Sequence, residues 1–502
     1  MLLATSALIK QIDQYAENVL NISTLTLMKR AGEAVARAAR GMTSENDHII
    51  ILAGKGNNGG DGYASAELLC SDRKVVVLDV FAVGQRSGAG KHFLERCKSA
   101  GIEIREGAES LSELLPSAAL VIDAIFGTGY SGELSPELRG VSELVNNSGR
   151  LVLAVDLPLG IISDTAEVMD GALKADATVA LTLLKPAHLS YPAKEYVGAV
   201  SLCTLELDDH LDSFEFEFFS TDDDTFKSAV KKRLPTANKG SFGKTLHITG
   251  SEKYRGAAHL ALEAALRSGV GIVCHSGGGE LAAELRLKFP EAIYVDKLLP
   301  SDGGDPVFSA IGRYSSVLLG SGSSVSEELC LLAEGIISSE GAPVVIDADG
   351  INSIAKYSSP EIFLRAKRKI ILTPHPLEFS RLSGLSVEFI NEHRLSSAIS
   401  FAQKYGVILL LKGGATVITD GNVTYVNTSG SSALAKGGSG DVLAGLISSL
   451  VAFCDDPLSA TAAGAYVHGK AGDTLSAELS DYGVTPSDLP AEIARHIKLL
   501  MG

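Results

Sequence analysis

The chain has no tryptophan, and none of its six cysteines forms a CxxC pair or stands at metal-ligand spacing from histidine. This pattern excludes a disulfide framework and a zinc module, and it favours reduced core cysteines in a cytoplasmic protein. No hydrophobic run is long enough to span a membrane, and the N-terminus lacks the basic start and long apolar core of a signal peptide. We therefore expect a cytoplasmic protein with no membrane partner.

Positive charge is also scarce, with 44 Lys and Arg against 60 Asp and Glu and a net charge of −16. Such a surface excludes general binding to nucleic acid or anionic membranes. An anionic ligand must instead be held by backbone amides and a few local cations. The length of 502 residues, with 45% hydrophobic residues and 52 glycines, favours an α/β enzyme of two domains.

Continuously apolar runs, not alternating ones, separate helical segments along both halves of the chain. They are typical of parallel strands covered on both faces. We predict strands at 48–54, 75–83, 119–126, 151–157, 178–184, 196–205, 245–250, 270–275, 316–320, 343–348, 369–373, 407–412, 415–419 and 423–427. Helices are predicted at 24–41, 256–268 and 441–452. The pattern lapses around 206–235, so we expect two doubly wound α/β domains, 1–220 and 221–502.

Two glycine-rich loops follow strands of the first domain. Residues 54–59 fit GxGxxG, with Asp79 about twenty residues on, and residues 127–132 give a second match. Two such loops in one sheet argue against a simple oxidoreductase with a single cofactor loop, and plain glycine turns remain an alternative. Polar residues of the first loop bring oxygens that suit a cation or a ligand hydroxyl. These residues are Asn57, Asn58 and Asp61.

The segment Lys436-Gly-Gly-Ser-Gly-Asp441 leads into an apolar helix. Two glycines and a serine leave backbone N–H groups bare at the start of that helix, which makes an anion site. Asp441 follows directly and lies beside this anion site. An anion site beside one acid suits phosphoryl transfer to a hydroxyl group, with the amides holding the phosphate and the acid taking the proton. The alternative is an ordinary helix start with an acid in its first turn.

Three more strand ends of the second half carry polar groups, namely Asp347, His375 and Lys412. Each alone is consistent with a structural role, Asp347 as a turn cap and His375 as a loop residue. Ligands of open α/β sheets bind at the carboxyl ends of strands. We therefore expect these groups to converge with Asp441 on one crevice.

Several motifs together resemble a known family. The N-terminal ones include GKGNNGGDG (54–62) and DAIFGTGYSGE (123–133), and the C-terminal ones include LTPHP (372–376), LKGGAT (411–416) and KGGSGDVLAG (436–445). The chain resembles the bifunctional NAD(P)H-hydrate repair enzymes, in which an NAD(P)HX epimerase domain precedes an ADP- or ATP-dependent NAD(P)H-hydrate dehydratase domain. The resemblance implies a Rossmann-like three-layer sandwich followed by a ribokinase-like domain.

The resemblance also implies site residues. The epimerase positions are Asn57, Asn58, Gly59, Gly60, Asp61, Gly127, Thr128, Gly129, Tyr130, Ser131, Gly132, Glu133 and Asp156, with Asn58 and Asp123 as potassium ligands. The dehydratase positions are Ala257, Gly322, His375 and Asp441 for the hydrate, and Lys412, Gly413, Gly414, Ala415, Thr416 and Gly440 for the nucleotide. Asp441 would activate the ring hydroxyl for phosphorylation, with Mg²⁺ accompanying ADP or ATP. We also expect a homo-oligomer.

One departure bears on the first domain. Where the family has Ser-Gly-Ile-Asp after its Asp-x-Pro, this chain has Leu159-Gly-Ile-Ile162. Leu159 offers no side-chain oxygen to potassium, which predicts weakened ion binding and slow epimerisation. The main alternative is a ribokinase-like kinase of a small metabolite, with the first domain as a non-catalytic binding or oligomerisation module.

Overall fold

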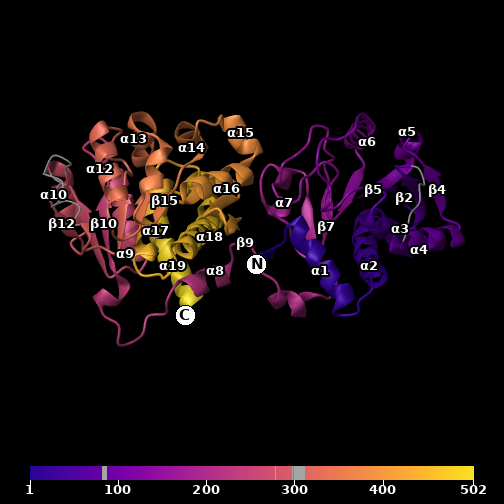
Figure 1. The fold of residues 1–502 in the computed structure, drawn as a ribbon, viewed down its shortest axis with the longest axis horizontal. Helices are drawn as coiled ribbons and strands as arrows, with labels where there is room; N and C mark the ends of the chain where they lie inside the picture. Colours follow the sequence, from indigo (N-terminus) through magenta and orange to yellow (C-terminus); the bar gives the residue numbers. More distant parts are fainter. Residues whose placement is uncertain (82–87, 278, 297, 299–310) are drawn as a thin grey trace. The chain divides into compact units, whose positions relative to one another are not determined.

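The computed structural model describes residues 1–81, 88–277, 279–296, 298 and 311–502. The chain forms two compact units, one of Leu2–Phe218 and one of Phe219–Gly502 together with Met1 (Figure 1). Each unit is built on its own largely parallel sheet with helices on both faces. The predicted α/β fold class is confirmed.

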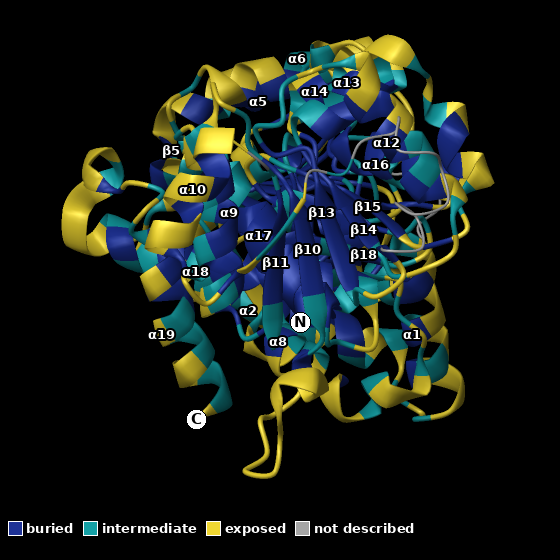
Figure 2. Cartoon of the chain, turned by 90° about the vertical axis from the view of Figure 1, so that its left-hand side faces the viewer, coloured by how far each residue is buried: buried dark blue, intermediate teal, exposed yellow. Residues whose placement is uncertain are grey.

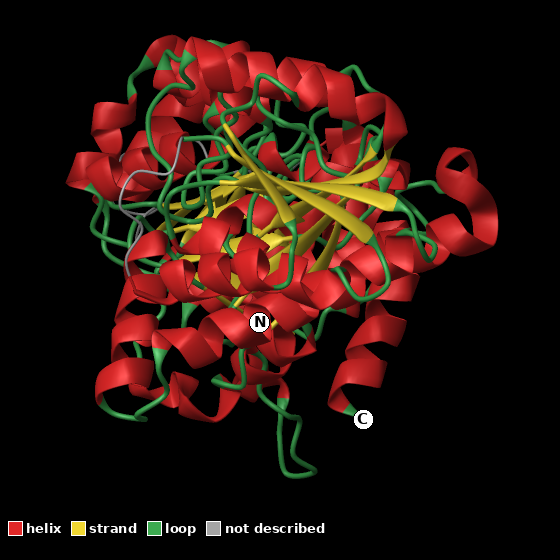
Figure 3. Cartoon of the chain, turned by 90° about the vertical axis from the view of Figure 1, so that its right-hand side faces the viewer, coloured by secondary structure: helices red, strands yellow, loops and turns green. Residues whose placement is uncertain are grey.

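The sheet of the N-terminal unit has the strand order β4-β3-β2-β5-β6-β7-β8, and all its neighbouring strands are parallel. The strands are β2 (His48–Ala53), β3 (Lys74–Asp79), β4 (Glu103–Glu106), β5 (Ala118–Ala124), β6 (Leu151–Val155), β7 (Ala177–Leu181) and β8 (Ala199–Cys203). Figure 3 shows these strands in yellow between red helices. Because β2, β5, β6 and β7 are parallel neighbours in this order, their carboxyl ends lie side by side at one end of the sheet.

Two hydrophobic cores cover the two faces of this sheet. Ile49 and Ile51 of β2 belong to one core, which includes residues of α2 (Thr24–Met42), α3 (Asn57–Leu69) and α4 (Gly88–Ser99). Ile50 and Leu52 belong to the other, which includes residues of α5 (Leu111–Leu114) and α6 (Pro136–Asn146). Successive side chains of a strand point to opposite faces, so a continuously apolar strand fills both cores.

The sheet of the C-terminal unit runs β9-β18-β17-β16-β15-β14-β13-β10-β11-β12. Its strands are β9 (Phe218–Ser220), β10 (Lys244–Ile248), β11 (Ile272–Ser276), β12 (Ile293–Val295), β13 (Ser316–Leu319), β14 (Val344–Ile346), β15 (Ile370–Leu372), β16 (Ile408–Leu411), β17 (Thr416–Thr419) and β18 (Thr424–Asn427). The strands from β12 to β16 are parallel, whereas β16, β17 and β18 pair in antiparallel fashion. Figure 2 shows its strands β10, β11 and β13 as largely buried.

Helices α9 (Arg255–Arg267), α17 (Ser439–Val451), α18 (Pro457–Gly483) and α19 (Leu489–Met501) pack together in this unit, and α17 lies against β13 and β14. Leu446, Ile447 and Leu450 of α17 are fully buried in this core. The first turn of α17 therefore has a rigid support.

Each predicted strand corresponds to an observed one, although residues 82–83 of the first half lie outside the described residues. The sequence interpretation missed β4, β9 and β12, as well as the two-residue β1 (Leu2–Leu3). β4 and β12 are edge strands, and β4 reads Glu-Ile-Arg-Glu, which lacks the apolar run that marks the buried strands. Within the described parts of the chain, no helix has the length and apolar character needed to cross a membrane.

Candidate active sites

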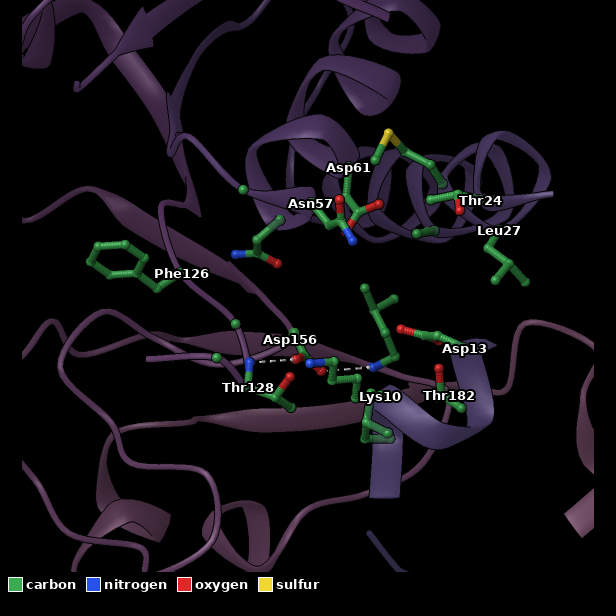
Figure 4. Close-up of a pocket in the computed structure, with 18 of the residues that line it drawn as sticks. Lys10, Asp13, Thr24, Leu27, Asn57, Asp61, Phe126, Thr128, Asp156 and Thr182 are labelled. Atoms are coloured by element: carbon green, nitrogen blue, oxygen red, sulfur yellow. Dashed lines mark hydrogen bonds between the residues drawn. The ribbon is translucent and has the colours of Figure 1, made fainter. Parts of the chain in front are cut away.

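A cavity of about 620 Å³ opens at the carboxyl ends of β2, β5, β6 and β7 in the N-terminal unit (Figure 4). Residues of α1 (Ser6–Asn18) and α2 close its other side. The predicted epimerase residues that line it are Asn57, Asn58, Asp61, Gly127, Thr128, Gly129, Tyr130 and Asp156. The remaining predicted positions, Gly59, Gly60, Ser131, Gly132 and Glu133, are not part of its wall.

Glycine is required where the loops of this cavity approach one another. A Cβ atom at Gly127 would lie 2.9 Å from Asp156 Oδ2 and 3.3 Å from Asn58 Oδ1. A Cβ atom at Gly59 would lie 1.9 Å from the carbonyl oxygen of Gly54. Gly59 thus lets α3 start directly against its strand, while Gly127 brings three strand ends together.

Asp156 is the centre of a buried polar network. Its carboxylate accepts hydrogen bonds from Thr128 N at 3.2 Å and Leu181 N at 3.2 Å, and it pairs with the ammonium group of the fully buried Lys185. Asp156 has a φ of 68° and Thr182 one of 65°, conformations that non-glycine residues rarely adopt. Such backbone strain is concentrated at functional sites.

His188 completes this network as a neutral imidazole. Its Nδ1 accepts from the backbone N–H of Lys185 at 2.9 Å, so its Nε2 carries the proton and donates to the carbonyl oxygen of Asp156 at 2.7 Å. Burial lowers the pKa of His188 to about 4. Both ring nitrogens are therefore occupied in holding Lys185 and Asp156 in place.

Two carboxyl groups of the cavity are shifted toward their protonated forms. Burial, reinforced by the charges of Asp156 and Asp13, raises the pKa of Asp61 well above its ordinary value. Burial raises the pKa of Asp13 to about 6, with Lys185 opposing the shift and Asp156 adding to it. Sequence reasoning missed Asp13, because α1 precedes every recognised motif. It also gave no role to Lys185 or His188.

The proposed potassium ligands lie in different surroundings. Asn58 faces the cavity, and its Nδ2 has no hydrogen-bond partner among the described residues. Asp123 is fully buried, and its two oxygens accept from Ile125 N at 3.1 Å and Leu159 N at 2.7 Å. The Leu159 side chain is fully buried in a hydrophobic core. Each Asp123 oxygen already accepts one backbone amide, and Leu159 supplies no side-chain oxygen, so the expected potassium shell lacks one ligand here.

In the C-terminal unit, Asp347 joins the ends of several strands. Its Oδ1 accepts from Thr373 Oγ1 at 2.8 Å and from Lys412 Nζ at 3.1 Å, and its Oδ2 accepts from Ser321 Oγ at 2.9 Å. Burial alone would lower the pKa of Lys412, but Asp347 and Glu378 outweigh it and raise that pKa. The structure thus brings Asp347 and Lys412 into direct contact.

Asp441 lies in the first turn of α17, whose N-cap Gly438 has a φ of 107°. Burial raises the pKa of Asp441 to about 7, with Asp347 adding to the shift and Lys412 opposing it. A Cβ atom at Gly440 would lie 3.3 Å from Lys412 Nζ. Asp441 and the nucleotide segment predicted at Lys412 therefore belong to one electrostatic site.

The predicted hydrate-binding residues flank this site. His375 caps α14 (Pro376–Ser383), where its Nδ1 accepts from the backbone N–H of Leu377 and of Glu378, each at 3.2 Å. Burial lowers the pKa of His375, and its Nε2 lies 3.4 Å from Glu378 Oε1. A Cβ atom at Gly322 would lie 2.5 Å from that of Ala257, so these two positions touch.

The backbone of the Lys412–Thr416 segment is held by a residue that sequence reasoning missed. Arg394, on α16 (Arg394–Tyr405), donates to the carbonyl oxygens of Leu411 at 3.2 Å and Lys412 at 3.1 Å. Gly413 has a φ of 149°, and a Cβ atom there would lie 2.7 Å from the Arg394 guanidinium. Arginine is a common helical residue, so its position in the sequence carried no signal.

The comparisons with known proteins identify the family of the chain. The sequence profile described as NAD(P)H-hydrate dehydratase matches residues 245–495, and the one described as YjeF-related protein N-terminus matches residues 24–187. The bifunctional NAD(P)H-hydrate repair enzyme of Thermofilum pendens is 33% identical over 98% of this chain and 95% of its own. The chain belongs to the bifunctional NAD(P)H-hydrate repair enzymes. The predicted family is confirmed.

Other members of the family give the same result. The Escherichia coli repair enzyme is 30% identical over 97% of this chain and 92% of its own. Among solved structures, the ADP/ATP-dependent NAD(P)H-hydrate dehydratase of Bacillus subtilis, co-crystallised with ATP and Mg²⁺, is 28% identical with a TM-score of 0.50. The match covers 56% of this chain and 98% of that one.

Proposed function

We propose that the protein repairs hydrated nicotinamide cofactors, with the C-terminal unit dehydrating S-NAD(P)HX at the expense of ADP or ATP. This proposal rests on Asp441, a carboxyl group with a pKa of about 7 in the first turn of α17. A general base works best when its pKa is near the working pH. At neutral pH a large fraction of Asp441 is ionised and can accept the proton of a hydroxyl group.

The chemistry then follows in two steps. Asp441 takes the proton of the ring hydroxyl, and the hydroxyl oxygen attacks the terminal phosphorus of the nucleotide. The bond from that phosphorus to the bridging oxygen breaks, so AMP leaves when ADP is the donor and ADP leaves when ATP is the donor. The bare amides before Asp441 and the ammonium of Lys412 stabilise the charge that builds on the phosphoryl oxygens. The C–O bond then breaks, phosphate leaves, and loss of a proton from the neighbouring ring carbon restores the dihydronicotinamide.

We assign the nucleotide to the segment from Lys412 to Thr416 with Gly440, and the hydrate to Ala257, Gly322, His375 and Asp441. Carboxylates near Asp441 suit Mg²⁺ that arrives with the nucleotide phosphates, since such ions use one or two protein carboxylates. Asp349 is our candidate, because one of its oxygens, Oδ2, accepts from Ser324 N at 2.9 Å and it is half-buried beside Asp347. The metal would neutralise phosphate charge.

For the N-terminal unit we propose interconversion of R- and S-NAD(P)HX in the 620 Å³ cavity. Its volume and the polar strand ends at residues 57–61, 127–130 and 156 support a dinucleotide ligand. Residues 1–220 would then be the epimerase domain and residues 221–502 the dehydratase domain. Because the potassium shell is incomplete, we propose an epimerase that works slowly and without potassium.

One assay separates this proposal from the alternative of a small-metabolite kinase. Hydrated NADH or NADPH is mixed with the protein, Mg²⁺ and either ADP or ATP, and the absorbance of the restored dihydronicotinamide is followed. A repair enzyme restores that absorbance and releases phosphate in equal amounts. A kinase of another metabolite would leave the absorbance unchanged. The same assay ranks ADP against ATP, and from the family resemblance we expect ADP to be preferred.

A further inference from the structure

Epimerisation requires a proton donor in the N-terminal cavity. In the hydrate the hydroxyl group is bound to the ring carbon next to nitrogen, so its loss is assisted by the nitrogen lone pair. The hydroxyl must be protonated to leave as water, because hydroxide is a poor leaving group. Water must then return to the other face and give up a proton. A group that first donates and then accepts a proton is needed beside the ring.

Three titratable groups at the cavity, Lys185, His188 and Asp156, are already engaged in one network. Lys185 is fully buried, pairs with Asp156 and donates to the carbonyl oxygen of Leu181 at 2.6 Å. Both nitrogens of His188 have partners in the same network. Asp156 accepts from Lys185 and two backbone amides, so its carboxylate oxygens are already engaged. None of the three can release and recover a proton without breaking the network.

Asp13 differs from these residues. It projects from α1 into the cavity, and in Figure 4 its carboxyl group points toward the space between Asp61 and Asp156. Among the described residues it accepts no hydrogen bond, and it is partly exposed, whereas Asp61 is only 7% exposed. Asp13 can therefore exchange protons with solvent and still reach a bound ring.

We propose that Asp13 is a further catalytic residue of the N-terminal cavity, the carboxyl group that carries the proton to and from the hydroxyl group of the bound hydrate. The inference rests on the proposed epimerase function and adds a residue that lies outside the matched segment 24–187. Burial reinforced by Asp156 keeps the carboxyl group protonated to an unusually high pH, which supports the assignment.

The step balances as follows. The Asp13 carboxyl proton passes to the hydroxyl oxygen, the C–O bond breaks with its electron pair on oxygen, and water departs while the nitrogen lone pair forms a C=N bond. Water then adds to the opposite face of the same carbon, and the C=N electron pair returns to nitrogen. The proton of the added water returns to the Asp13 carboxylate, so no other reactant is consumed.

The surroundings determine how the rate should depend on pH. The charged groups that line the cavity with Asp13 are Lys10 and Glu17 on α1 itself, Lys55 and Asp61 from the first glycine loop and α3, and Asp156 and Lys185 from the strand ends. Of these, Lys185 and Asp156 act most strongly on Asp13. The residues that α2 contributes to the cavity wall, Thr24, Leu27, Met28 and Ala31, carry no charge. Because the acid form acts first, the wild-type rate should fall as the pH rises above about 6, the pKa of Asp13.

The test is R-to-S interconversion of NADHX by the full chain between pH 5 and 8, without nucleotide. Asp13→Asn should lower the enzyme-catalysed rate by roughly two orders of magnitude and remove the fall above pH 6, while calorimetry shows unchanged hydrate binding. Asp13→Glu should restore part of the rate together with the pH dependence. Gln11→Ala, exposed on the same helix, is the matched control and should behave as wild type.

Different failures have different meanings. A wild-type chain that never exceeds the spontaneous rate would refute the proposed epimerase itself. A wild-type chain that interconverts the epimers while Asp13→Asn keeps its rate and pH profile would refute the role of Asp13 alone. If Asp13→Asn and Asp13→Glu both lose the rate and both have a lowered Tm, Asp13 has only a structural role.

Discussion

The backbone N–H of Leu159 donates to Asp123 Oδ2 at 2.7 Å, while the Leu159 side chain is fully buried in a hydrophobic core. The carboxylate that the family resemblance gives to potassium is here held by two amides. We therefore expect the wild-type chain to interconvert R- and S-NADHX at the same slow rate in potassium and in sodium buffers. Fast, potassium-stimulated interconversion would show that backbone carbonyls or water complete the ion shell.

Leu159→Ser should lower the free energy of unfolding of the N-terminal unit. Removing a fully buried leucine leaves a cavity, and such changes cost about 2–5 kcal/mol. Chemical denaturation monitored by circular dichroism measures this. Leu144→Ser, at a position 43% exposed on α6, is the control and should cost far less. If Leu159→Ser is as mild as the control, water or an ion has occupied the vacated space.

Asp441→Asn should lower the kcat of the dehydratase by roughly two to four orders of magnitude while nucleotide affinity remains near that of wild type. The amide has nearly the same shape but cannot accept the hydroxyl proton. Asp224→Asn, exposed on α8 (Asp223–Ala229), serves as control. Retention of more than about a tenth of the wild-type kcat would exclude Asp441 as the base.

Gly440→Val should weaken nucleotide binding. Position 440 already lies close to Lys412 Nζ, since a Cβ atom would be 3.3 Å from it, and a branched side chain would obstruct the approach of phosphate. Calorimetry with ADP and Mg²⁺ gives the affinity. Gly41→Val, in α2 of the N-terminal unit, is the control, because a Cβ atom there meets no neighbour within 4 Å. Equal affinities for the two variants would place the phosphates elsewhere.

The C-terminal unit should lose stability in acid. Burial lowers the pKa of His247 to about 3 and that of His468 to about 4, so both histidines gain a proton only on unfolding. Their contribution to stability is complete above the unfolded pKa of about 6.5 and is lost as the pH falls toward the folded values. Tm measured from pH 7.5 to 4.5 should decrease, and less steeply for His247→Asn. If Tm falls with pH at the same slope in wild type and in His247→Asn, His247 does not contribute to the loss of stability in acid.

The sequence was sufficient for the elements that have strong local signals. Apolar runs such as His48–Ala53 predicted buried strands, and the glycines before Asp441 predicted a helix start that exposes amides. It could not reveal contacts between residues far apart in the chain. The bonds from Ser321 and Thr373 to Asp347, or from Arg394 to the backbone of Lys412, depend on how distant strand ends meet. Ser321, Thr373 and Arg394 are of common residue types, so the sequence alone does not indicate their partners.

Asp347 has a consequence for how the two ligands of the C-terminal unit would affect each other. Its carboxylate accepts hydrogen bonds from Ser321, Thr373 and Lys412. Ser321 precedes Gly322 in the chain, and Thr373 lies two residues before His375. If a nucleotide draws the Lys412 ammonium toward its phosphates, as proposed above, it would also change the bonds that Asp347 makes beside the proposed hydrate positions. Thermodynamic reciprocity then requires that each ligand change the affinity of the other by the same factor. Binding of the nucleotide and binding of the hydrate would thus be coupled through the Asp347 carboxylate.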